Sequence, residues 1–216
     1  MTRSRALRAA LSGALSLAVL TGMLVRHAWP LWTGEVRYLR VQPYDTRDMF
    51  RGDYVMLNYD IQTLSLRLPP SEVTPRPAPE YPADVTPPPP PPSVDVVGDW
   101  WRADRPWRWW HDRRLYVQLR EEPSSDPGVP ARYVPVSISD APVEGAVNLE
   151  GRVRYFDRPY TVNLHYGLDA FYVREGRARS LVAPPDGTQT MHAEIAVTPG
   201  GQARVRALIV DGVRVE

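Results

Sequence analysis

Hydrophobic and polar positions divide this chain into one apolar N-terminal run and a long series of short alternating segments. The apolar run covers residues 9–25, contains no charged residue and is preceded by three arginines within the first eight positions. Its length approaches the roughly 17–25 residues that a membrane-spanning helix needs. Trp29 and Trp32 follow the run, where aromatic side chains favour the membrane interface. The pattern therefore predicts one N-terminal transmembrane helix.

An apolar run at this position is typical of either a cleaved signal peptide or an uncleaved anchor. A cleavage site needs small residues near the end of the run, and residues 23–26 are Met, Leu, Val and Arg instead. We therefore expect an uncleaved transmembrane anchor at residues 9–25. Clustered N-terminal arginines favour residues 1–8 in the cytoplasm. The protein is then expected to be a single-pass protein of the cell membrane with a periplasmic C-terminal domain.

Beyond the anchor, the alternation of apolar and polar residues predicts a β domain at residues 35–216. Nine segments are short, rich in Val, Tyr, Ile and Leu, and bounded by Gly, Pro or Asp. They are 35–42, 53–61, 114–120, 132–139, 146–156, 160–167, 170–175, 192–198 and 203–210. Many short strands with such punctuation predict a mainly β fold, a single antiparallel β-barrel or sandwich.

A Pro/Trp-rich insertion interrupts the strand pattern at about 69–112. Its proline run at 87–92 cannot donate to a sheet ladder, which favours a solvated loop or a polyproline II ligand. Five tryptophans lie between residues 98 and 114, interleaved with arginines. These tryptophans could cover one end of the β domain or lie at a lipid surface. A formal net charge of +1 argues against nucleic acid as a partner.

Composition excludes several kinds of chemistry. The chain has no Cys, and all 26 of its basic Lys/Arg positions are Arg. Disulfides, thiolate metal sites, a cysteine nucleophile and a lysine base are therefore excluded.

The segment 43–61 concentrates charged residues, a Gly-Asp-Tyr turn and an alternating strand. Period two places Leu57 and Tyr59 on one face of that strand, the expected core face, and Tyr54 on the other. Gly52 suits a tight turn because glycine readily adopts positive φ. We therefore interpret Gly52, Leu57 and Tyr59 as structural residues.

Four readings compete for the charged residues of this segment. In the first reading these residues form a salt-bridged turn, and in the second they bind a divalent cation. In the third they act as paired acid/base carboxylates, and in the fourth they dock a partner. The arginines oppose a cation, and the spacing of Asp45, Asp48 and Asp53 matches no calcium loop. We expect no metal, no cofactor and no catalytic residue. The predicted partner-binding residues are Asp45, Arg47, Arg51, Asp53 and Tyr54.

The same segment resembles the signature of the bacterial GDYXXLXY family, P-x-D-x-R-D-x-F-R-G-D-Y-x-x-L-x-Y, over residues 43–59. Four later blocks are similar to the family's downstream blocks. They are LYVQL (115–119), EGRVRYF (150–156), YGLDAFYVREG (166–176) and ARVRALIVDG (203–212). The chain departs from the family pattern at Tyr44, Asp169 and Arg174, and in the Pro/Trp-rich insertion.

The resemblance implies an uncharacterised envelope protein that is anchored in the membrane and associated with a polytopic membrane protein. It implies no reaction. Our main hypothesis is therefore a non-catalytic binding or accessory domain. The alternative is a signal-peptidase-like serine hydrolase, which also has an N-terminal anchor and an R-G-D-x-V strand. Without lysine, that enzyme would need His111, His165 or His192 beside a serine. The candidate serines are Ser65, Ser137 and Ser139.

Overall fold

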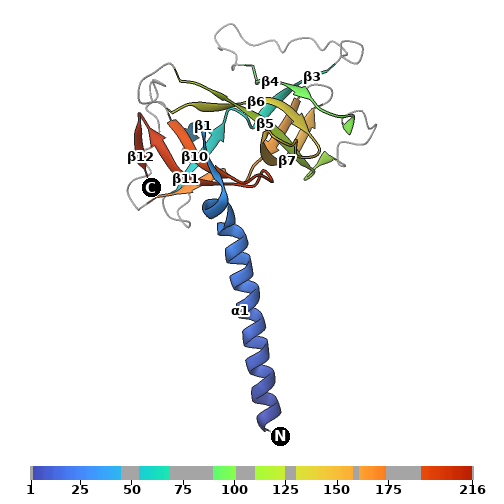
Figure 1. Ribbon diagram of the computed structural model, residues 1–216, viewed down its shortest axis with the longest axis vertical. Helices are drawn as coiled ribbons and strands as arrows, with labels where there is room; N and C mark the ends of the chain where they lie inside the picture. The colour runs from blue at the N-terminus through green and yellow to red at the C-terminus, as the bar shows by residue number, and fades with distance from the viewer. Residues whose placement is uncertain are drawn as a thin grey trace.

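The computed structural model shows one long helix that carries a β domain at its C-terminal end (Figure 1). It describes residues 2–44, 54–68, 90–100, 110–124, 130–157, 161–173 and 191–215. The predicted residues 45–53, most of the Pro-rich stretch and residues 101–109 lie outside the described part. The elements are α1 (Thr2–Thr33), β1 (Glu35–Tyr44), β2 (Tyr54–Tyr59), β3 (Thr63–Arg67), β4 (Ser93–Val96), β5 (Arg114–Glu122), β6 (Arg132–Ser139), β7 (Val147–Asp157), β8 (Thr161–His165), β9 (Ala170–Tyr172), β10 (Met191–Val197), β11 (Ala203–Val210) and β12 (Val213–Val215).

Helix α1 is longer than the predicted anchor. Its stretch Ala10–Thr33 is long and apolar enough to cross a membrane, and none of its apolar window is buried in the rest of the chain. Pro30 lies inside the helix, so it cannot donate the backbone bond to the carbonyl four residues earlier. The helix ends where the amide of Gly34 donates to the carbonyl of Pro30 at 2.9 Å. Helix α1 contacts the domain at β10 and β11.

The β domain combines a closed barrel with an open sheet. The barrel has the strand order β3-β4-β6-β5-β7-β8, and the six-stranded sheet has the order β12-β11-β10-β1-β2-β9. This confirms the predicted mainly β fold and the predicted barrel. Most strand pairs are antiparallel, but β3–β4 and β4–β6 are parallel. A parallel pair needs a long crossover, and the Pro-rich stretch supplies it between β3 and β4.

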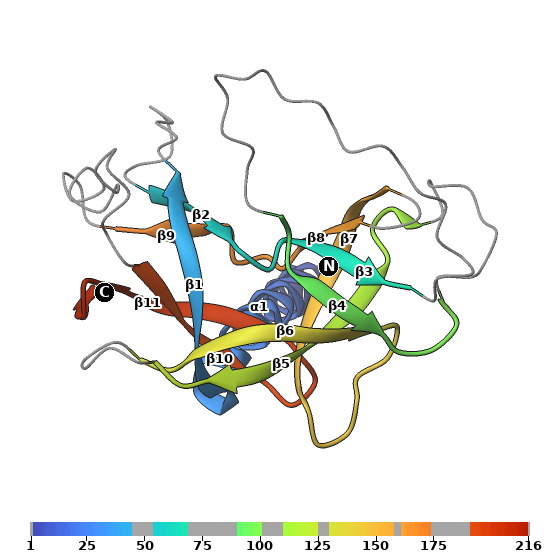
Figure 2. The ribbon, with the colours of Figure 1, turned by 90° about the horizontal axis from the view of Figure 1, so that it is seen from above.

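Strand β1 sets the position of the signature segment relative to the helix. Its first half, Glu35 to Arg40, pairs with β10, and its second half, Val41 to Tyr44, pairs with β2. Figure 2 shows α1 end-on while β1 runs across the view, so the strand crosses the end of the helix instead of continuing its axis. The chain therefore reaches the start of the signature segment at one side of the domain.

Two of the five tryptophans in the Trp-rich segment belong to the core. Trp110 is fully buried and Trp100 is 8% exposed. The ring of Trp110 stacks on Phe156 with centroids 5.3 Å apart, and Trp100 meets Trp110 edge-on at 5.5 Å. These two tryptophans therefore pack against the β domain, as one of the two interpretations of the segment expects. Trp101, Trp107 and Trp109 lie outside the described residues.

Burial of His192 makes the stability of the sheet depend on pH. The residue is 4% exposed and lies opposite Arg40 in the β1–β10 ladder. Burial, then the charges of Arg40 and Arg132, lower the pKa of His192, while Asp60 opposes them weakly. Histidine in the unfolded chain titrates near pH 6.5. The unfolded state therefore binds more protons below that pH, and stability falls as the pH drops from about 6.5 towards the lowered pKa.

We expect His192→Gln to flatten the decline in melting temperature between about pH 6.5 and 5, and to leave the profile above pH 7 unchanged in slope. The exposed His111 provides the control, because His111→Gln removes a histidine without removing a buried one. Burial raises the pKa of Asp60, which adds an opposite trend at lower pH. A wild-type profile that stays flat through this range would contradict the assignment to His192.

Candidate functional site

The structure describes only part of the predicted partner-binding set. Asp45, Arg47, Arg51 and Asp53 lie outside the described residues, as does Gly52. The strand that follows is described from Tyr54 onward. Leu57 and Tyr59 are buried, with 1% and 4% of their surface exposed, and Tyr54 is half-buried on the other face.

Tyr54 lies at an exposed edge of the open sheet. It pairs in register with Tyr172 of β9, which is the last strand of that sheet. The two rings are 6.0 Å apart between centroids, and Tyr172 is 66% exposed. Two tyrosines therefore stand together where the signature segment joins the sheet.

The inward half of the signature is locked to the turn between β8 and β9. The phenol of Tyr59 donates to the carbonyl of Leu168 at 2.9 Å, and the amide of Leu57 donates to the carbonyl of Asp169 at 2.8 Å. Burial, then the negative charge of Asp169, raises the pKa of Tyr59 well above its usual range. The hydroxyl thus stays protonated and continues to donate.

A second tyrosine makes the reciprocal contact. The phenol of Tyr166 donates to the carbonyl of Ile61 at 2.8 Å, and burial raises the pKa of Tyr166. Its ring lies against β7 at Gly151, where an added Cβ would meet the ring carbon Cε1 at 2.9 Å. Three blocks singled out in the sequence, around residues 57–59, 150–156 and 166–169, therefore meet in one interlocked unit.

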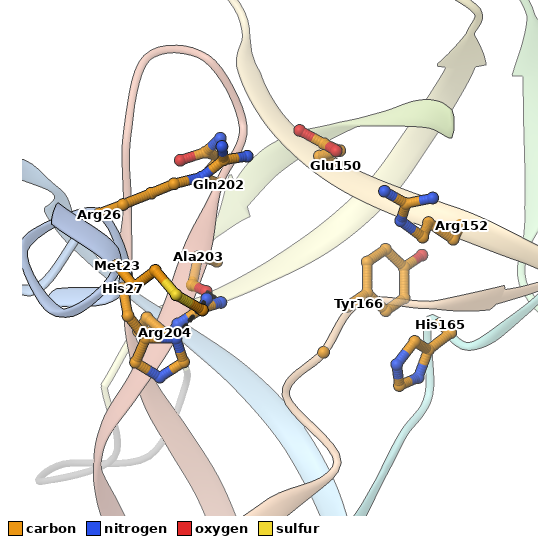
Figure 3. A pocket seen from close by; sticks show the side chains of 11 residues that line it. Met23, Arg26, His27, Glu150, Arg152, His165, Tyr166, Gln202, Ala203 and Arg204 are labelled. Carbon is orange, nitrogen blue, oxygen red and sulfur yellow. Dashed lines mark hydrogen bonds between the residues drawn. The ribbon is translucent and has the colours of Figure 1, made fainter. Parts of the chain in front are cut away.

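The same unit forms one wall of a pocket under the domain. The cavity has a volume of about 500 Å³ and lies where α1 meets the β domain. Figure 3 shows residues of α1 facing residues of β7 and of the turn after β8 across the cavity, with the β10–β11 hairpin beside the helix. The lining residues are Met23, Arg26, His27, Glu150, Arg152, His165, Tyr166, Gly167, Gln202, Ala203 and Arg204.

The pocket has an excess of positive charge. Among the described residues, three arginines line it, Arg26, Arg152 and Arg204, against one carboxylate, that of Glu150. That carboxylate is 3.3 Å from the guanidinium of Arg114, which offsets its charge. A site with this composition can hold an anion and disfavours a metal cation.

Two of these arginines differ in their existing partners. Arg152 pairs with Asp112 at 3.0 Å. Arg204 has no carboxylate among its contacts in the described residues: Nη1 donates to the carbonyl of its neighbour Ala203 at 2.8 Å, and Nη2 lies 3.1 Å from Nδ1 of His27. Its Nε is buried without a hydrogen-bond partner in the described part of the chain. Among the described residues, Arg204 therefore has no acidic partner for its positive charge beside the helix.

A histidine and a carboxylate form a short contact at the rim of the pocket. Nδ1 of His165 is 2.6 Å from Asp169, and Arg154 approaches both, at 3.0 and 3.5 Å. Gln62 donates to the second carboxylate oxygen at 3.3 Å. The carboxylate thus has three partners, which fixes the turn that carries Tyr166.

The serines considered for a hydrolase have other partners. Ser137 donates to the side-chain oxygen of Gln118 at 2.9 Å, and Ser139 donates to the carbonyl of Ala141 at 2.6 Å. Gln118 also donates to Asn148 at 3.0 Å. These contacts form a polar network between barrel strands, and in the described residues neither of these two hydroxyls is bonded to a histidine.

The sequence did not single out the pocket arginines as a site. In the sequence, Arg26 only follows the apolar run, and Arg152 and Arg204 only fall within alternating segments. The available signal was indirect, because the blocks at 150–156, 166–176 and 203–212 each contribute one part of the lining.

Comparison with known proteins agrees with the motif. Searches of curated proteins and of solved structures return no match. A family model described as GDYXXLXY protein matches residues 16–208, which include the signature strand and all of the interlocked blocks. The chain belongs to the GDYXXLXY protein family.

Proposed function

We propose that this protein is a membrane-anchored, extracytoplasmic binding domain that docks on a polytopic membrane protein of the cell envelope, without catalysing a reaction. The docking surface comprises the signature segment, with Asp45, Arg47, Arg51 and Asp53, and the adjoining residue Tyr54.

The observation that carries this proposal is the tyrosine pair at the sheet edge. Tyr172 exposes two thirds of its surface beside Tyr54, and both lie on the face opposite the buried Leu57 and Tyr59. Tyrosine is enriched in protein interfaces because its ring buries apolar area while its hydroxyl can bond. The core therefore accounts for one face of the signature strand, and a partner accounts for the other.

The geometry of β1 supports a partner that is itself in the membrane. The strand runs across the end of α1 (Figure 2), so the signature segment begins beside the helix axis and not on its extension. With α1 in the membrane, this side of the domain overhangs the bilayer next to the anchor. A neighbouring polytopic protein would stand there.

Photo-cross-linking in cells tests the proposal. A photoreactive amino acid in place of Tyr172 is expected to cross-link the protein to an integral polytopic membrane protein. Adding Tyr54→Ala and Arg47→Ala is expected to reduce recovery at least about tenfold, because interface hot spots contribute 2 kcal/mol or more.

Tyr155 provides a matched control, because it is 52% exposed and lies on β7 in the barrel. The same photoreactive residue at position 155 is expected to give no such cross-link. Recovery of only soluble proteins from position 172 would rule out the polytopic partner. Labelling of Ser65, Ser137 or Ser139 by a fluorophosphonate would instead favour the serine hydrolase.

A further inference from the structure

We propose that the pocket between α1 and the β domain binds the phosphate headgroup of an anionic phospholipid from the leaflet that faces the domain. This inference rests on the membrane anchoring assumed in the proposed function, but it uses different residues. The ligand would enter between the helix and the domain, in the cavity that Arg26, Arg152 and Arg204 line.

The position of the pocket along α1 matches the headgroup layer. Arg26 directly follows the uncharged run that ends at residue 25. The headgroup region on each side of a bilayer is roughly 5–7 Å thick, which corresponds to about four residues of helix at 1.5 Å each. Trp29 and Trp32 lie just beyond and are 51% and 68% exposed, as expected for aromatic side chains at the interface. If the span ends at residue 25, the lining residues Arg26 and His27 lie at the depth of the lipid phosphates.

The charges of the pocket favour an anion at that depth. Glu150 and Arg152 are each compensated by a partner outside the lining, Arg114 and Asp112. Within the described residues, Arg26 and Arg204 have no carboxylate within ion-pair distance. An anion in the cavity would therefore meet two arginines that have no carboxylate partner among the described residues.

The chemistry of the arginines and the size of the cavity favour a phospholipid headgroup as the ligand. Guanidinium groups bind phosphate through paired, charge-assisted hydrogen bonds. A cavity of about 500 Å³ is large enough for a phosphate and its polar substituent. The excess of two formal positive charges favours a lipid with a net negative charge over a zwitterionic one.

A second cavity beside the end of α1 lacks these properties. It has a volume of about 580 Å³ and is lined by Glu35, Arg37 and Glu144 among other residues. Its lining carries one more acidic than basic residue. This second cavity therefore does not share the positive charge of the cavity at Arg26 and Arg204.

Lipid retention by the full-length protein tests the inference. The protein is purified in a mild detergent, and phosphatidylglycerol or phosphatidylcholine adducts are quantified by native mass spectrometry. We expect preferential retention of phosphatidylglycerol. Arg26→Ala and Arg204→Ala are each expected to reduce it about fivefold, because a surface arginine contributes about 1 kcal/mol to anionic lipid binding.

Two controls separate site binding from general charge and from misfolding. Arg67→Ala removes one arginine on β3, on the side of the domain away from α1 (Figure 1), and is expected to leave retention unchanged. Arg26→Ala alters an exposed helix position without an ion-pair partner in the described residues, so it is expected to fold normally even where Arg204→Ala does not. Equal retention by wild type and Arg26→Ala would overturn the proposal.

Two further measurements separate a lipid headgroup from free phosphate as the ligand, and test whether the protein is anchored in the membrane. Inorganic phosphate at tens of millimolar is expected not to displace the lipid, and full displacement would indicate a site for a free anion. Flotation with vesicles of phosphatidylglycerol and phosphatidylcholine reports anchoring alone. If the protein floats but mass spectrometry shows no preference for phosphatidylglycerol, the pocket proposal is refuted and the docking proposal is left intact. Failure to float refutes the anchoring on which both depend.

Discussion

Gly34→Ala is expected to separate the end of α1 from the β domain. A Cβ at this position would lie 2.4 Å from the carbonyl oxygen of Pro30 and 2.9 Å from backbone atoms of both Ala196 and Val197. All three neighbours are backbone atoms, so no side-chain rotation can relieve the overlap. Forced overpacking costs about 1–3 kcal/mol and more where the backbone must move. The helix is therefore expected to shift away from β10 and to widen the pocket.

The absence of cysteine makes this displacement measurable. Spin labels on cysteines introduced at His27 and Gln202, which both line the pocket, report the distance between helix and hairpin. We expect a longer and broader distance distribution in Gly34→Ala. Gly22→Ala is the matched control, since nothing lies within 4 Å of its added Cβ and alanine favours the helix. An unchanged distribution in Gly34→Ala would show that the junction is not rigid.

The alternation of residues predicted most of the strands because their inward faces are mainly apolar. In β2, Val55, Leu57 and Tyr59 alternate with more exposed residues, as period two requires. In β8, Val162 and Leu164 do the same. One buried face is enough to fix a strand and its register. The strands that alternation predicted therefore include most of those in both the barrel and the open sheet.

The missed strands are short and lie beside unfavourable sequence. β3 and β4 have five and four residues and flank the Pro-rich stretch, and β12 has three. Val94 of β4 is nevertheless completely buried in the barrel. Its parallel pairing with β3 depends on a crossover, which local alternation does not encode. These strands therefore form because they close the barrel, and not because of their own β propensity.

The candidate pocket could not be predicted from local patterns. Its charged residues come from α1, β7 and the β10–β11 hairpin, so more than 120 residues separate Arg26 from Arg152 along the chain. Each residue taken alone resembles a solvent-exposed arginine. Only the return of β10 and β11 to the end of α1 brings Arg204 next to His27. The resemblance of the blocks to a family singles out the segments that line the pocket, but it does not show that these segments share a cavity.

Removing the two buried phenol hydroxyls is expected to destabilise the domain substantially. Tyr59→Phe leaves the buried carbonyl of Leu168 without its donor, and Tyr166→Phe does the same to Ile61. Each loss is expected to cost about 1–3 kcal/mol of unfolding free energy. Denaturant unfolding of the full chain, followed by tryptophan fluorescence, measures it, because Trp100 and Trp110 are buried in the core. Tyr155→Phe, at an exposed position, is expected to have almost no effect.

A double-mutant cycle shows whether the two hydrogen bonds act as one unit. Both join the end of β2 to the turn after β8, so loss of the first is expected to loosen the segment that the second holds. The combined cost in Tyr59→Phe/Tyr166→Phe is then smaller than the sum, with a coupling of about 0.5–3 kcal/mol. Gly151→Ala perturbs the same unit, since its Cβ would displace the ring of Tyr166. Its cost should therefore fall in the Tyr166→Phe background, where the hydrogen bond is already lost. Strict additivity in both combinations would show that the signature strand and the turn fold independently, and that the L-x-Y half of the signature reflects burial of its side chains alone.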